Sequence, residues 1–93
     1  MVEFAATGSK IYFNGRIVPE REATVHVLSG AVKYGATVFE GICAYLGDEG
    51  RLTVFRLPEH LLRLRDSMRI MRFEHDWSVS HLTEVVTDVI KAN

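Results

Sequence analysis

Residues 58–71, PEHLLRLRDSMRIM, decide the fold class of this chain. Pro58 suits the first position of a helix, because its φ is already fixed and it has no N–H to leave unpaired. Glu59 beside it favours the positive end of the helix dipole. Apolar residues then return at intervals of three and four positions, as they do on the buried side of an amphipathic helix. The stretch therefore predicts a helix with one apolar stripe, made of Leu61, Leu64, Met68 and Met71.

A second helix is expected after Ser78, whose hydroxyl can accept a hydrogen bond from the first turn. We expect this helix to fray at residues 91–93. Its apolar stripe consists of Val79, Leu82, Val86 and Val89, with Ile90 beside them.

The part of the chain before Pro58 predicts strands and turns. Residues 10–13 and 16–18 flank Asn14-Gly15, a pair that tolerates positive φ at both central positions of a type I′ turn. Pro19 should end the second strand, because it cannot donate to a ladder. Ser29 is expected to cap a short helical turn that reaches Tyr34 and stops at Gly35. Three further runs read as strands, namely residues 24–28, 39–46 and 51–55, the last two around a turn at 47–50.

Strands followed by two helices indicate an α+β fold, a mostly antiparallel sheet with two helices packed on one face. The chain has 93 residues, which allows one domain. A domain of this size buries only about 60–65% of its unfolded surface, so its core must be small.

Composition excludes several classes of partner. Lys and Arg number 11 against 12 Asp and Glu, for a net charge of −1, so nothing favours nucleic acid or an anionic membrane. No stretch approaches the roughly 18 apolar residues that span a bilayer. The first residues contain Glu3 and no apolar leader, and Cys43 has no second cysteine to pair with. We therefore expect a cytoplasmic protein in which Cys43 is a buried, inert thiol.

The arginines of the first helix allow two interpretations. Arg63 lies on the flank of the apolar stripe, on the same side as His60 and Ser67. The arginines can form a solvated face with local pairs, such as Glu59 with Arg63 or Asp66 with Arg69. Alternatively, an arginine at the edge of a core can bind a phosphate through paired N–H groups. The four histidines have no metal-ligand spacing, so no metal site is expected.

Leu62 and Ile70 fall on the far side of the same helix. They are either scattered surface residues or a second face that is buried against another domain or subunit.

Residues 34–41 read Tyr-Gly-x-x-x-Phe-Glu-Gly, and residues 59–64 read Glu-His-x-x-Arg-Leu. With the preceding Val25-His26-Val27 and Tyr12-Phe13-Asn14-Gly15, these motifs resemble the N-terminal region of branched-chain aminotransferases. These enzymes are the fold-type IV transaminases, which depend on pyridoxal 5′-phosphate. The resemblance covers nearly the whole chain.

The resemblance implies roles for four residues. Arg63 matches the arginine that binds the phosphate of the cofactor, and Phe39 matches an aromatic wall of the substrate pocket. Tyr34 matches a tyrosine that reaches a substrate pocket across the dimer. Gly41 matches a position where the backbone comes close to the substrate. The implied partners are an amino acid, a 2-oxo acid, the large domain of the same enzyme and a second subunit.

The sequence also departs from the family pattern. Gly30 and Lys33 stand where histidines are usual, and Cys43 stands where a basic residue is usual. None of Lys10, Lys33 and Lys91 corresponds to the Schiff-base lysine, which lies in the family's larger second domain. The other fold-type IV enzymes, D-amino-acid transaminases and aminodeoxychorismate lyases, usually lack Phe-Glu-Gly here.

We therefore expect residues 1–93 to be an N-terminal small domain, possibly incomplete, without the large lysine-bearing domain. The implied parent reaction moves the amino group of a branched-chain L-amino acid to 2-oxoglutarate, and this chain should be inactive alone. The alternative is a free-standing, non-catalytic binding module with the same fold.

Overall fold

The computed structural model describes residues 8–93, so the expectation drawn from Glu3 lies outside it. The fold class is confirmed as α+β. The strands form two separate antiparallel pairs rather than one sheet. In chain order the elements are β1 (Lys10–Phe13), β2 (Arg16–Pro19), the 3-10 helix η1 (Glu20–Glu22), α1 (Gly30–Lys33), β3 (Ala44–Leu46), β4 (Leu52–Val54), α2 (Leu57–Ile70) and α3 (Val79–Lys91).

The first hairpin forms as its turn predicts. Asn14 and Gly15 have φ of 51° and 88°, the positive values that a type I′ turn requires at both central positions. The register pairs Ile11 with Val18, and Val18 is buried. Pro19 is the last residue of β2, where its missing N–H costs no ladder bond.

The expected strand at residues 24–28 is wrong. His26 organises a turn there, because its Nδ1 accepts a hydrogen bond from the N–H of Leu28 at 3.0 Å and its carbonyl accepts one from the N–H of Ser29 at 2.9 Å. Side chains that capture nearby backbone donors compete with strand pairing.

The expected strand at residues 39–46 is shortened to β3. Between residues 36 and 43 the even-numbered residues are half-buried and the odd-numbered ones exposed. This alternation is that of an extended chain, and we call residues 36–43 the extended segment. Ladder pairing starts only where the N–H of Phe55 donates to the carbonyl of Cys43, at 2.9 Å. The segment packs against helices rather than against a second strand.

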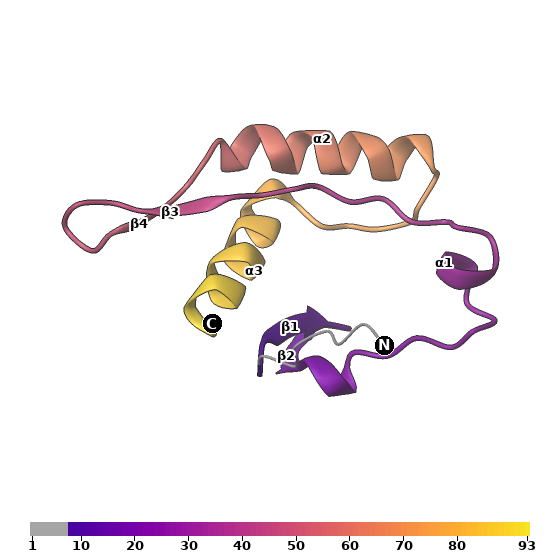
Figure 1. Cartoon of the computed structure of the whole chain (residues 1–93). Coiled ribbons are helices and arrows are strands. Elements are labelled where there is room, and N and C mark those ends of the chain that lie inside the picture. The colour runs from indigo at the N-terminus through magenta and orange to yellow at the C-terminus, as the bar shows by residue number, and fades with distance from the viewer. Residues whose placement is uncertain (1–7) are drawn as a thin grey trace.

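Helix α2 supplies two of the three buried apolar residues in the described part of the chain, and α3 supplies none. Leu61 on α2 is only 1% exposed, and Met68 is also buried. The prediction for Met71 is wrong: it is an exposed residue at the C-terminal cap of α2, beyond the packed turns. Figure 1 shows α2 running alongside the extended segment, with α3 crossing towards β1. The apolar stripe of α3 is half-buried in this position.

Both serine caps are confirmed. The Oγ of Ser29 accepts a hydrogen bond from the N–H of Val32, and the Oγ of Ser78 accepts one from the N–H of His81 at 3.0 Å. Gly35 has a φ of 64°, as expected for the residue that stops the short helix α1.

Helix α3 ends at Lys91, as expected, but Asn93 after it is held by hydrogen bonds rather than frayed. The amide side chain of Asn93 accepts from the N–H of Lys10 at 2.9 Å and donates to the carbonyl of Lys10 at 3.1 Å. The end of α3 is thereby tied to the first residue of β1. In the part of the chain that the structure describes, no helix is long and apolar enough to cross a membrane.

Candidate functional site

Arg63 and Glu40 form a two-pronged ion pair between α2 and the extended segment. The Nε of Arg63 donates to Oε2 of Glu40 and the Nη2 of Arg63 donates to Oε1, both at 2.8 Å. Parallel bonds of this kind fix the plane of the guanidinium as well as its position. The pair joins residues that are 23 positions apart in the sequence.

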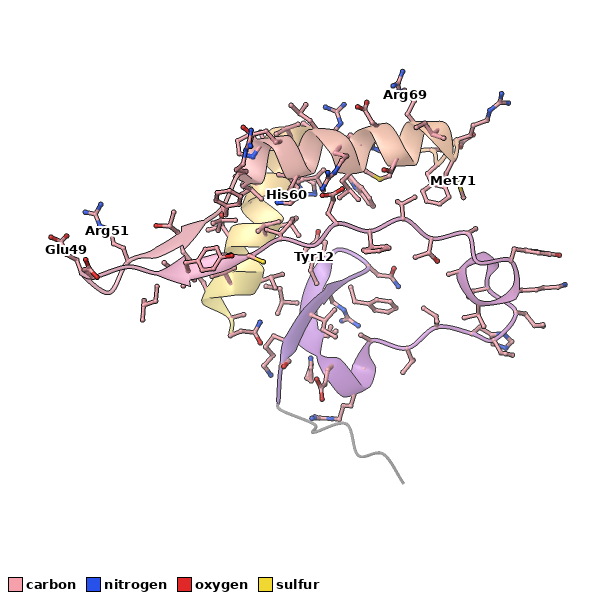
Figure 2. All side chains as sticks on the ribbon, turned by 45° about the horizontal axis from the view of Figure 1, so that its top comes forward. Tyr12, Glu49, Arg51, His60, Arg69 and Met71 are labelled. Atoms are coloured by element: carbon pink, nitrogen blue, oxygen red, sulfur yellow. The ribbon has the colours of Figure 1, made fainter. Side chains whose placement is uncertain are left out.

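His60 contacts the same carboxylate from the preceding turn of α2. Its Nδ1 lies 2.7 Å from Oε1 of Glu40. Since an ionised carboxylate can only accept, Nδ1 of His60 must carry the proton in this contact. Figure 2 shows His60 on the side of α2 that faces the extended segment, whereas Arg69 projects away from the molecule. We call Glu40, His60 and Arg63 the acid–base cluster.

The cluster holds Glu40 in its charged form. Hydrogen bonds from Arg63 and then His60 outweigh the effect of burial and lower the pKa of Glu40 from 4.5 to about 2. Glu40 in turn raises the pKa of Arg63, so the guanidinium stays charged. Glu40 and Arg63 therefore form an ion pair at any pH well above 2.

A pocket of about 370 Å³ opens beside the cluster at the N-terminal end of α2. It is lined by Phe55, Arg56, Glu59, His60 and Arg63. Arg63 keeps 69% of its side chain exposed although Glu40, its partner, is only 7% exposed. The carboxylate is thus enclosed behind the guanidinium, and the guanidinium faces open space.

The other predicted site residues are not in contact with Arg63. Phe39 is 84% exposed and, with Gly41, lies on the odd-numbered side of the extended segment, opposite Glu40. A Cβ built on Gly41 would meet nothing within 4 Å. Tyr34 lies at the C-terminal cap of α1 and is 75% exposed.

Of the two local pairs in the solvated-face interpretation, Glu59 with Arg63 does not form. Arg63 is engaged by Glu40, and Glu59 instead lies 3.8 Å from Arg56. The expected pair of Asp66 with Arg69 is confirmed at 3.3 Å. Cys43 is exposed rather than buried, because it falls on the odd-numbered side of the extended segment.

The residues that depart from the family pattern lie apart from the cluster. Gly30 begins α1, and Lys33 in the same helix places its Nζ 5.2 Å from the centre of the Tyr34 ring. Across residues 8–93, no group of histidine, cysteine, aspartate or glutamate side chains could hold a metal ion.

Sequence reasoning missed Glu40 as a site residue. The signal was present, because Glu40 is the acid of the Phe-Glu-Gly motif, and His60 and Arg63 are three positions apart on one face of α2. What the sequence could not reveal is that the motif's acid turns towards that face while Phe39 turns away.

The chain is similar to proteins of one class, both in sequence and in structure. No family model matches the chain. The branched-chain-amino-acid aminotransferase of Salmonella typhimurium is 48% identical over 83 residues, which are 89% of this chain and 26% of that protein. The crystal structure of the Escherichia coli branched-chain amino acid aminotransferase covers 94% of this chain and 28% of its own, with a TM-score of 0.86 and 45% identity. The enzyme from Thermobaculum terrenum, solved in its PLP form, matches 91% of this chain and 28% of its own, with a TM-score of 0.79 and 34% identity.

The fold and its relatives define the class: the chain has the architecture of part of a fold-type IV, pyridoxal-phosphate-dependent aminotransferase. More narrowly, it is a homologue of the branched-chain-amino-acid aminotransferases. It spans about a quarter of the length of the curated relatives that it matches.

Proposed function

We propose that this chain is the small-domain part of an aminotransferase that moves the amino group of a branched-chain L-amino acid to 2-oxoglutarate. The observation that carries the proposal is the 48% identity to a branched-chain-amino-acid aminotransferase over 83 residues. The relatives' names favour this substrate class over D-amino acids or aminodeoxychorismate.

Arg63 is the residue that we assign to the cofactor's phosphate. Its donors fit a phosphate group, because the side chain is charged, held at a fixed angle and open to the pocket at the start of α2. Arg56 brings a second positive charge to the same pocket. When bound, pyridoxal phosphate supplies the electrophilic carbon and electron-withdrawing ring that carry an amino group between two acids.

The chain lacks a lysine placed for this chemistry. Lys10, Lys33 and Lys91 lie in β1, α1 and the end of α3, and none lines the pocket beside Arg63. We therefore assign the cofactor-bearing lysine to a large domain, and we expect residues 1–93 to be inactive alone.

Three residues are proposed to shape the substrate side of the site. The exposed ring of Phe39 would form an apolar wall, and the open space around Gly41 would let a substrate approach the backbone. Tyr34 is 75% exposed at the C-terminal cap of α1, and we assign it to the pocket of a second subunit because the family resemblance implies that role. This assignment makes a homodimer part of the proposal.

The large domain is the proposed partner of the exposed apolar face of α2. Leu62 is 53% exposed and Ile70 is 75% exposed, and both lie away from the packed side of the helix. A cytoplasmic location, expected from the lone cysteine and the composition, is also part of the proposal.

A chimera tests the function. The matched 83 residues of the Escherichia coli aminotransferase are replaced by the corresponding residues of this chain, to which they are 47% identical. We expect the chimera to transfer the amino group of leucine to 2-oxoglutarate and the 93-residue chain alone to show no turnover. A chimera with the Salmonella segment at the same junctions controls for the joins. Activity in that control but not in the chimera would contradict the proposal, as would turnover by the 93-residue chain.

A further inference from the structure

We propose that Glu40 is a positioning residue: it grips one edge of the Arg63 guanidinium so that the opposite edge faces the pocket and binds the phosphate. The inference rests on the proposed role of Arg63 in the preceding section. Glu40 belongs to the Phe-Glu-Gly motif, and the role proposed for it requires no direct contact with substrate or cofactor.

Within residues 8–93, the guanidinium of Arg63 has one edge bound to Glu40 and one edge free. An arginine has five N–H donors in a rigid plane, grouped in two edges that can each meet an oxyanion. Glu40 uses the edge formed by Nε and Nη2, at 2.8 Å to each of its oxygens. The edge formed by Nη1 and the second N–H of Nη2 remains, and among the described residues it has no hydrogen-bond partner. One anion already holds the side chain, and the free edge is shaped for a second.

Glu40 and Arg63 differ strongly in exposure, and this difference indicates which residue holds the other. The side chain of Glu40 is 7% exposed, so it is a buried anchor, whereas that of Arg63 is 69% exposed. An exposed arginine without such an anchor samples many rotamers and loses conformational entropy on binding. An arginine held by two parallel bonds has already lost that freedom, which favours binding of the next ligand.

His60 fixes the anchor itself. Its Nδ1 bonds to Oε1 of Glu40 at 2.7 Å, and the His60 side chain is only 17% exposed. The carboxylate therefore accepts three hydrogen bonds, from two residues one helical turn apart on α2. It cannot rotate without breaking at least one of them.

Charge alone makes the opposite prediction, which allows a sharp test. Glu40 is negative and close to the proposed phosphate, so its charge repels the ligand. If Glu40 acted only through charge, Glu40→Gln would bind phosphate more tightly and Glu40→Asp would bind it equally well. If Glu40 positions Arg63, both variants bind more weakly, since glutamine offers one acceptor and aspartate is one methylene too short.

The experiment uses the ¹⁵N-labelled 93-residue chain and inorganic phosphate as the probe. The Nε–H signal of Arg63, assigned by its loss in Arg63→Lys, reports the bond to Glu40. Shifts of this signal and of the α2 amides on titration give the dissociation constant. We expect Glu40→Gln and Glu40→Asp each to raise that constant by about threefold or more, and Glu40→Gln to broaden or remove the Nε–H signal. The α2 and α3 amide signals confirm that each variant is folded.

Asp66→Asn is the matched control. Asp66 lies on the same helix and its loss changes the net charge equally, but it pairs with Arg69 and does not line the pocket. We expect this variant to bind phosphate as tightly as the original chain. Equal or tighter binding by Glu40→Gln, or an unchanged Nε–H signal, would overturn the inference. Absence of any phosphate effect on Arg63 in the original chain would instead contradict the proposed function, while the Nε–H signal would still decide whether Glu40 orients Arg63.

Discussion

Glu40 and Arg63 meet edge to edge, with both N–O distances at 2.8 Å, and thereby join the extended segment to α2. Neither residue belongs to the apolar core, which among the described residues consists of Val18, Leu61 and Met68. The site and the core are therefore separate features of the fold, and substitutions can address them independently.

The ion pair makes stability depend on pH in a defined window. The pKa of Glu40 falls from 4.5 to about 2 on folding, so its ionised form stabilises the folded chain. This contribution is fully present above about pH 4.5 and is lost as the pH falls towards 2. We expect the difference in urea midpoint between the original chain and Glu40→Gln to shrink over that window. A difference that is the same at pH 6 and pH 2.5 would show that Glu40 does not titrate in this way.

The core is tested by two adjacent leucines. Leu61 is 1% exposed, so Leu61→Ala should destabilise the chain by roughly 2–3 kcal/mol through lost burial and a cavity. Leu62 is 53% exposed, and Leu62→Ala should change stability by less than about 0.5 kcal/mol. Urea denaturation followed by circular dichroism measures both. Similar losses of stability in the two variants would contradict the burial of Leu61 and the exposure of Leu62.

The end of α2 offers a stabilising substitution. Arg72 has a φ of 58°, and the N–H of Phe73 donates to the carbonyl of Met68 at 2.9 Å, as in a Schellman motif. Glycine adopts this conformation without the steric cost that arginine bears, so Arg72→Gly should stabilise the chain by about 0.5–1 kcal/mol. Arg69→Gly, inside the helix, should instead cost about 1 kcal/mol. A loss of stability in Arg72→Gly would contradict the geometry of this cap.

The apolar outer face of α2 should matter only in the larger enzyme. Because Leu62 and Ile70 are exposed here, the double variant Leu62→Lys with Ile70→Lys should leave the 93-residue chain within about 1 kcal/mol of its original stability. In the chimera, the same lysines would face the large domain, and burying their charges should lower leucine turnover about tenfold or more. Arg69→Lys on the same helix is the control. Undiminished turnover in the double variant would contradict the proposal that this face contacts the large domain.

Local signals predicted much of the fold. The Asn14-Gly15 turn, the caps at Ser29 and Ser78 and the stripe around Leu61 depend on residues within a few positions of one another, and all are found. Two departures from the predicted fold come from a captured backbone group and from a contact distant in sequence. His26 captures a backbone donor and prevents a strand, and Asn93 reaches Lys10 across 83 positions.

One residue of the candidate site could be predicted from the sequence, and its partner could not. Arg63 could be proposed from its place on the flank of α2 together with the motif around it. Its partner could not, because the pairing depends on which way residue 40 faces, and that is set by the packing of the extended segment against α2. Sequence alternation leaves two choices of face, and only the tertiary contact selects one.

The central claim, that Arg63 binds the cofactor's phosphate, is tested most directly by the affinity of the chimera for pyridoxal phosphate. We predict that Arg63→Ala raises the dissociation constant of pyridoxal phosphate by about tenfold to a hundredfold, the usual value of a charged hydrogen-bonding group. Arg69→Ala, on the same helix and 77% exposed, should leave the constant unchanged. Equal affinity in the Arg63→Ala and Arg69→Ala chimeras would contradict the account.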